Sequence, residues 1–125
     1  MLETQTVLGA IDPVLVELLQ RVYTAFNRRE IETVLAAMEA DVDWPNGMEG
    51  GRVQGQGSVR EYWRRQFEVL DPKVEPKNFS RASDGRIVVD VHQVVHDKSG
   101  KLVVDQMVRH VYEIRRGLIR SMEIR

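Results

Sequence analysis

The sequence predicts an α+β fold in which three N-terminal helices pack on a curved antiparallel sheet. Apolar residues recur at helical spacing through the first half of the chain, and an alternation rich in Val and Ile dominates from Val74 onward. The 125 residues suit one domain and leave no room for a second with its own core. We expect an N-terminal arm over residues 1–11 and a single domain over residues 12–125.

The first helix is expected to begin at Asp12-Pro13, because Asp can accept hydrogen bonds from free N–H groups and Pro fits the first helical position. Its inward stripe consists of Leu15, Leu18, Leu19, Val22 and Phe26. A second, shorter apolar stripe predicts a helix over residues 31–38. A brief extended piece follows over residues 42–46, and its proline marks an edge strand.

The glycine-rich stretch 47–57 is expected to be a loop. Ser58-Val59-Arg60-Glu61 matches a capping box, so a third helix should open there. Asp71-Pro72 should end that helix.

Three long strands are predicted over residues 86–97, 101–115 and 118–125. Two connections, 98–100 and 115–117, resemble three-residue loops in which a final Gly supplies the positive-φ position. Pairing across these loops would place the even-numbered side chains between residues 88 and 112 on one face, together with Met122. Both faces are apolar, and three helices can cover only one, so the other face is expected to form a homodimer.

Composition excludes several classes of protein. The chain has 18 Lys and Arg against 19 Asp and Glu, which lacks the basic excess typical of a nucleic-acid binder. It has no cysteine, which removes disulfides and thiolate metal sites. No apolar run approaches the roughly 20 residues of a membrane span, and the first residues lack the pattern of a signal peptide. We expect a soluble, cytoplasmic protein with no membrane or nucleic-acid partner.

Helices interrupted by a short strand and followed by a long antiparallel sheet resemble the nuclear transport factor 2-like superfamily. This superfamily includes ketosteroid isomerases, SnoaL-like polyketide cyclases and limonene-type epoxide hydrolases. The resemblance covers about residues 12–125 and rests on the order of four segments, which are 29–34, 40–44, 53–59 and 114–119. It implies a cone of helices and sheet that holds a small, largely apolar carbonyl compound.

The catalytic residues of these families match only in part. The ketosteroid isomerase base falls on Asn46 and the oxyanion-hole aspartate on His110, so isomerisation by that mechanism is not expected. The Tyr-x-Asn of the epoxide hydrolases resembles Trp44-Pro45-Asn46, but their Arg-x-Asp becomes Asp90-Val91-His92 and their last-strand aspartate becomes Ile124. SnoaL-like cyclases use an acid–base aspartate helped by histidine, and an Asp/His pair survives here.

The expected catalytic residues are Asp90, His92 and His110, on the face that looks into the cone. A carboxylate that accepts from one imidazole nitrogen leaves the other nitrogen as a general base. The expected substrate-binding residues are Trp44, Asn46, Trp63, Gln106, Tyr112 and Met122. The chemistry would be acid–base catalysis of the isomerase, cyclase or hydrolase/lyase type, with no cofactor and no metal ion.

Simpler interpretations stay open for the same residues. Asp90 and His110 would form a satisfied buried pair, His92 and Gln106 a cross-strand hydrogen bond, and Asn46 a turn. The protein would then be a non-catalytic ligand-binding or dimeric assembly module. A two-residue Arg116-Gly117 loop is a further alternative, which would flip the last strand and bring Glu123 inward.

Overall fold

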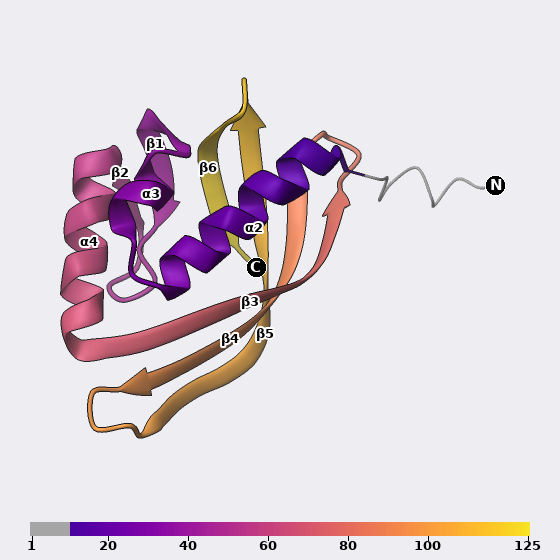
Figure 1. Cartoon of the computed structure of the whole chain (residues 1–125). Helices are drawn as coiled ribbons and strands as arrows, with labels where there is room; N and C mark the ends of the chain where they lie inside the picture. The colour runs from indigo at the N-terminus through magenta and orange to yellow at the C-terminus, as the bar shows by residue number, and fades with distance from the viewer. Residues whose placement is uncertain (1–10) are drawn as a thin grey trace.

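Figure 1 shows the computed structural model of the chain, which describes residues 11–125. The elements are α2 (Pro13–Asn27), α3 (Ile31–Leu35), β1 (Met38–Pro45), β2 (Arg52–Gln54), α4 (Gln56–Val69), β3 (Leu70–Arg81), β4 (Ile87–Asp97), β5 (Leu102–Arg115) and β6 (Leu118–Ile124). The predicted arm, residues 1–11, lies outside the described residues except for Ile11.

The strands form one sheet in the order β2-β1-β6-β5-β4-β3. β1 and β6 run parallel, and every other neighbouring pair is antiparallel. The sheet curves around α2, and α4 stands beside β1 and β2 (Figure 1). The predicted class, α+β with helices packed on a curved sheet, is confirmed.

The helices begin and end partly where the sequence signals place them. Asp12 caps α2, because its carboxylate accepts from the Val14 N–H at 2.9 Å. The second helix is shorter than predicted, since it ends at Leu35 and β1 begins at Met38. The third helix ends before Asp71-Pro72 as expected, and β3, which starts at Leu70, tolerates its prolines because it is an edge strand.

The predicted capping box does not start α4. The helix begins three residues earlier than a box with Ser58 as its N-cap would place it, at Gln56, with Gly55 as its N-cap and no side-chain cap. The Gln56 amide instead donates to the carbonyl groups of Leu35 and Met38, at 3.1 and 2.9 Å, and so ties α4 to the start of β1. The glycine-rich stretch also contains a strand, β2, which pairs with β1.

The β4–β5 hairpin contains a β-bulge that changes its predicted register. The turn is as expected, because the Asp97 N–H donates to the Lys101 carbonyl at 2.9 Å. Next to the turn, however, His96 pairs with Leu102 while Val95 pairs with Val104, which leaves Val103 without a partner. Beyond this additional residue, the odd-numbered side chains of β4 share a face with the even-numbered side chains of β5. The prediction that even-numbered side chains of both strands face the helices is therefore wrong for β4.

The β5–β6 hairpin combines a two-residue turn with a second bulge. Arg115 pairs with Leu118, so Arg116 and Gly117 form the turn with positive φ values of 55° and 78°. This is the alternative loop and not the three-residue one. This loop was expected to bring Glu123 inward, but it does not. A register shift leaves Arg120 without a partner residue on β5, so Met122 lies on the same face as Tyr112. Met122 is buried, whereas Glu123 pairs with Arg86 at 3.0 Å.

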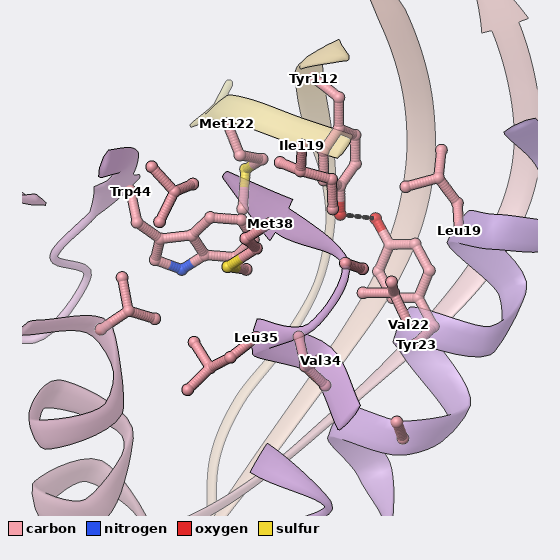
Figure 2. Packing of buried hydrophobic residues seen from close by; sticks show 14 of the residues in the cluster. Leu19, Val22, Tyr23, Val34, Leu35, Met38, Trp44, Tyr112, Ile119 and Met122 are labelled. Atoms are coloured by element: carbon pink, nitrogen blue, oxygen red, sulfur yellow. Dashed lines mark hydrogen bonds between the residues drawn. The ribbon is translucent and has the colours of Figure 1, made fainter. Parts of the chain in front are cut away.

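The core lies between the helices and the inner face of the sheet. Figure 2 shows α2, α3, β1 and β6 meeting there, with Trp44 and Tyr112 among aliphatic side chains. In β4 the core takes Ile87, Val89 and Val91, all odd-numbered and buried. Among the described residues, no helix has the length and apolarity that crossing a membrane requires.

The two-residue turn can be tested through Arg116, whose left-handed backbone favours Asn or Gly. Arg116→Asn should raise the free energy of unfolding by about 0.5 kcal/mol, because Asn adopts this conformation with less strain. Gly117→Ala should lower it by about 1 kcal/mol, since φ is also positive there. Urea unfolding at neutral pH measures both. If Arg116→Asn is no more stable than the wild type and Gly117→Ala is harmless, the turn is assigned wrongly.

Candidate functional site

A cavity of about 80 Å³ opens among α2, α4 and the strands β1, β5 and β6. This volume accommodates several water molecules and is smaller than the roughly 150 Å³ that holds a benzene ring, so an aromatic ligand would also occupy the open space beside the cavity. We call the cavity itself the cone cavity. Pro45, Gln93 and Ile124 border both this cavity and a more open hollow beside it, so they mark its mouth.

The wall of the cone cavity is mostly aromatic. The ring of Trp44 from β1 packs edge-on against Trp63 from α4, with their centroids 5.6 Å apart, and Phe26 from α2 packs against Trp63 at 5.5 Å. All three rings line the cavity, and no carboxylate does so among the described residues. Such a wall favours a largely apolar ligand.

A chain of hydrogen bonds crosses the core and ends at this cavity. The Tyr112 hydroxyl donates to the Tyr23 hydroxyl at 2.7 Å, as the dashed line in Figure 2 shows, and the Tyr23 oxygen lies 2.8 Å from Nδ1 of His110. If Nδ1 donated to Tyr23 instead, the buried Tyr23 O–H would have no acceptor among the described residues, so we assign the Tyr23 proton to the bond with Nδ1. The neutral imidazole of His110 then carries its proton on Nε2.

His110 is 6% exposed, and burial lowers its pKa from 6.5 to about 4. The ring is therefore uncharged at neutral pH. Nε2 has no hydrogen-bond partner among the described residues. Every fully buried side-chain nitrogen or oxygen in this part of the chain does have a partner, so Nε2 is not fully buried. Nε2–H is therefore accessible from the cavity that His110 lines.

The two tyrosines keep their protons. Burial raises the pKa of Tyr23 and of Tyr112 well above the usual value, and the neighbouring Tyr112 raises that of Tyr23 further. The tyrosines therefore fix the orientation of His110 without carrying charge.

The structure brings five of the predicted site residues to the cone cavity. These are Trp44, Trp63, His110, Tyr112 and Met122. They come from β1, α4, β5 and β6, which meet only in the folded chain.

Asp90 and His92, predicted to lie inside, are on the outer face of the sheet. The Asp90 carboxylate accepts from Nε of Arg109 at 3.0 Å, and Nε2 of His92 lies 2.7 Å from the Asp105 carboxylate. The cause is the bulge at Val103, which pairs Asp90 with Arg109 instead of Val108. The predicted placement of both residues in the cone is wrong, and so is the predicted contact of Asp90 with His110.

Asn46 and Gln106 also lie outside the lining of the cone cavity. Both polar atoms of the Asn46 side chain serve the β1–β2 loop, where Oδ1 accepts from the N–H groups of Met48 and Glu49 and Nδ2 donates to the Glu49 carboxylate. Asn46 is thus the turn residue of the simpler interpretation. The exposed Gln106 donates to the Gln93 side chain across the strands at 2.9 Å.

Sequence reasoning missed Tyr23 and Tyr62 as site residues. Tyr23 lies four residues after Leu19 and three before Phe26, so helical spacing alone would have placed it on the inner face. Tyr62 lies three residues after the buried Val59 on the same helix face, and the structure shows that it also lines the cavity.

Within residues 11–125, no group of three or more His, Asp or Glu side chains is arranged to hold a metal ion. The polar groups of the residues that line the site are imidazole, phenol, amide and indole N–H groups of this chain.

The low pKa of His110 predicts a pH dependence of stability. In the unfolded chain this residue binds a proton near pH 6.5, whereas in the folded chain it does so only near pH 4. The contribution of the uncharged His110 to the free energy of unfolding is complete above pH 6.5. It falls by about 3 kcal/mol as the pH is lowered from 6.5 to 4. Urea unfolding should show that the stability advantage of the wild type over His110→Gln shrinks by about that amount across this window. A constant difference between the two proteins would contradict a buried, neutral His110.

Solved structures of similar fold cover most of the chain. A nuclear transport factor 2-like protein of unknown function from Burkholderia pseudomallei is 26% identical over 91% of each chain, with a TM-score of 0.79. TerC, co-crystallised with polyporic acid, is 28% identical over 90% of each chain, with a TM-score of 0.77. A Xanthomonas campestris protein provisionally designated a polyketide cyclase is 20% identical over 89% of this chain and 88% of its own, with a TM-score of 0.70.

No curated protein matches the chain. The SnoaL-like domain matches residues 19–122, which span the elements from α2 to β6 and include every residue named above as lining the cavity except Ile124. The chain therefore belongs to the SnoaL-like domain family, within the nuclear transport factor 2-like superfamily.

Proposed function

We propose that the chain binds a small, largely apolar carbonyl compound in the cone cavity, and that Nε2–H of His110 donates to the carbonyl oxygen. The observation that carries this proposal is an uncharged donor at the end of a fixed hydrogen-bond chain, facing an aromatic cavity. A neutral donor suits a neutral acceptor, because neither has to be stripped of a charged hydration shell.

The geometry favours binding and polarisation over proton abstraction. A donor aimed at a carbonyl oxygen stabilises negative charge that develops there. Abstraction of a proton next to the carbonyl also needs a base, and no carboxylate lines the cavity among the described residues. His110 cannot easily pass a proton back through Tyr23, since the relay ends at the fully buried Tyr112, where burial raises the pKa. A non-catalytic ligand-binding protein is therefore the form of the proposal that the site supports best.

Two similar proteins point to organic ligands of this kind. TerC, 28% identical, was crystallised together with polyporic acid. The fold is also shared with a protein provisionally designated a polyketide cyclase. These likenesses support an organic ligand, while the choice of a carbonyl group rests on His110.

The chain offers a site-specific signal for testing this proposal. Its two tryptophans, Trp44 and Trp63, both line the cone cavity. Tryptophan fluorescence should therefore respond to acetophenone binding. The affinity of ethylbenzene, which has the same carbon skeleton without the oxygen, follows from its displacement of acetophenone. We expect acetophenone to bind about three- to tenfold tighter than ethylbenzene, as one net hydrogen bond provides.

His110→Phe should abolish this preference, and His96→Phe, near the β4–β5 turn and outside both the cavity lining and the proposed interface, should preserve it as the matched control. The ratio of the two affinities within one variant removes any general effect of the substitution on cavity shape. Equal affinities for the two compounds in the wild type, or a preference that persists in His110→Phe, would refute the proposal.

We also propose that two copies associate through the outer face of the sheet. Met107 is 58% exposed there, beside the His92–Asp105 and Asp90–Arg109 pairs. A large apolar side chain framed by charged pairs is typical of an interface centre with a polar rim. The self-complementary arrangement that a two-fold axis requires is available, because each copy offers both signs of charge.

Light scattering at micromolar concentration should give twice the chain mass of 14.4 kDa. Met107→Glu should halve that mass, because it would bury an unpaired carboxylate at the interface. Leu118→Glu, at the exposed β5–β6 turn, is the matched control and should leave the mass unchanged. A wild-type mass of 14.4 kDa, or a dimer that survives Met107→Glu, would exclude this interface.

A further inference from the structure

Tyr62 has a hydroxyl whose oxygen is fully engaged and whose proton is not. The residue is buried on α4 and lines the cone cavity. Its oxygen accepts from the Gly47 N–H at 3.0 Å and from the Gln66 amide at 3.4 Å. Both acceptor positions of the oxygen are thereby used.

The proton of this hydroxyl has no acceptor among the described residues. Burial raises the pKa of Tyr62, while the backbone N–H groups of Gly47 and Met48 partly oppose that shift. The hydroxyl is therefore protonated at neutral pH and can donate one hydrogen bond. The other two tyrosine protons differ, since the bonds to Tyr23 and His110 use them.

We propose that Tyr62 is a second hydrogen-bond donor of the cone cavity, so that its ligand is an apolar molecule with two acceptor oxygens, such as a diketone, a keto ester or a quinone. The inference rests on the proposed function for the first oxygen, which His110 holds. Tyr62 supplies the partner for the second oxygen.

The placement of the two donors supports one ligand that spans them. His110 comes from β5 on the sheet side and Tyr62 from α4 on the helical side, and both line the same cavity. Trp44 and Trp63 also line it and cover an apolar frame. A ligand with one oxygen would leave one of the two donors without a partner in an enclosed site, which reduces affinity.

The three isomers of diacetylbenzene test this inference, because they share one frame and differ in the separation of their two carbonyl oxygens. Acetophenone carries one of these carbonyls and is the reference compound. Affinities are measured by tryptophan fluorescence for the wild type, Tyr62→Phe and the control His96→Phe. We expect at least one isomer to bind the wild type and His96→Phe about three- to tenfold tighter than acetophenone.

Tyr62→Phe should remove this advantage, so that the ratio of the two affinities falls to about one in that variant. Because the ratio is taken within one variant, a general change of the cavity on loss of the Gly47 contact affects both compounds and cancels. The inference is overturned if no isomer binds tighter than acetophenone, if the advantage persists in Tyr62→Phe, or if both kinds of compound lose affinity in parallel. Failure of the proposed function has a different signature, which is the absence of an acetophenone preference over ethylbenzene that depends on His110.

Discussion

The bulge at Val103 sets which side chains of β4 and β5 face the helices, and the site depends on that choice. Neighbouring residues of a strand point to opposite faces, so one additional residue exchanges the faces of everything beyond it. With the bulge in place, Val89 lies opposite His110 on the inner face, and Asp90 lies opposite Arg109 on the outer face. Within the described part of the chain, the cavity lining therefore has an imidazole and no carboxylate, and Asp90 stays at the surface with a guanidinium partner.

The inward position of His110 requires the two tyrosines around it. Burying an imidazole and two phenols would be costly if their polar atoms lacked partners. The bonds from Tyr112 to Tyr23 and from Tyr23 to His110 use each hydroxyl proton once, and they leave only Nε2–H at the end that faces the cavity. Because α2 supplies Tyr23 and β5 supplies the other two, the same bonds also hold the helix against the sheet. The site and the core packing are stabilised by one set of contacts.

The sequence allowed the elements to be predicted better than their register. The cap at Asp12, the end of the third helix and the three long strands have local signals, such as an Asp-Pro pair or a run of β-branched residues. The bulges have none, because Val103 and Arg120 are ordinary strand residues whose lack of a partner follows from how the hairpins pack. Of the candidate site, residues on β1, α4 and β6 could be found from apolar spacing alone. Asp90 and His92 could not be excluded, since their face depends on a single residue near the turn.

The same register explains why the two faces have different chemistry. On the outer face, Asp90, His92, Asp105 and Arg109 are paired with one another and in reach of solvent, which screens their charges. On the inner face the polar groups are uncharged and less exposed, so a hydrogen bond there is worth more than it would be in water. The binding that we propose for the cone cavity therefore relies on a few neutral donors, while the charged groups form contacts at the surface. A carboxylate introduced beside His110 would meet the same burial that keeps this imidazole neutral, and its pKa would rise, because burial disfavours the charged form of either group.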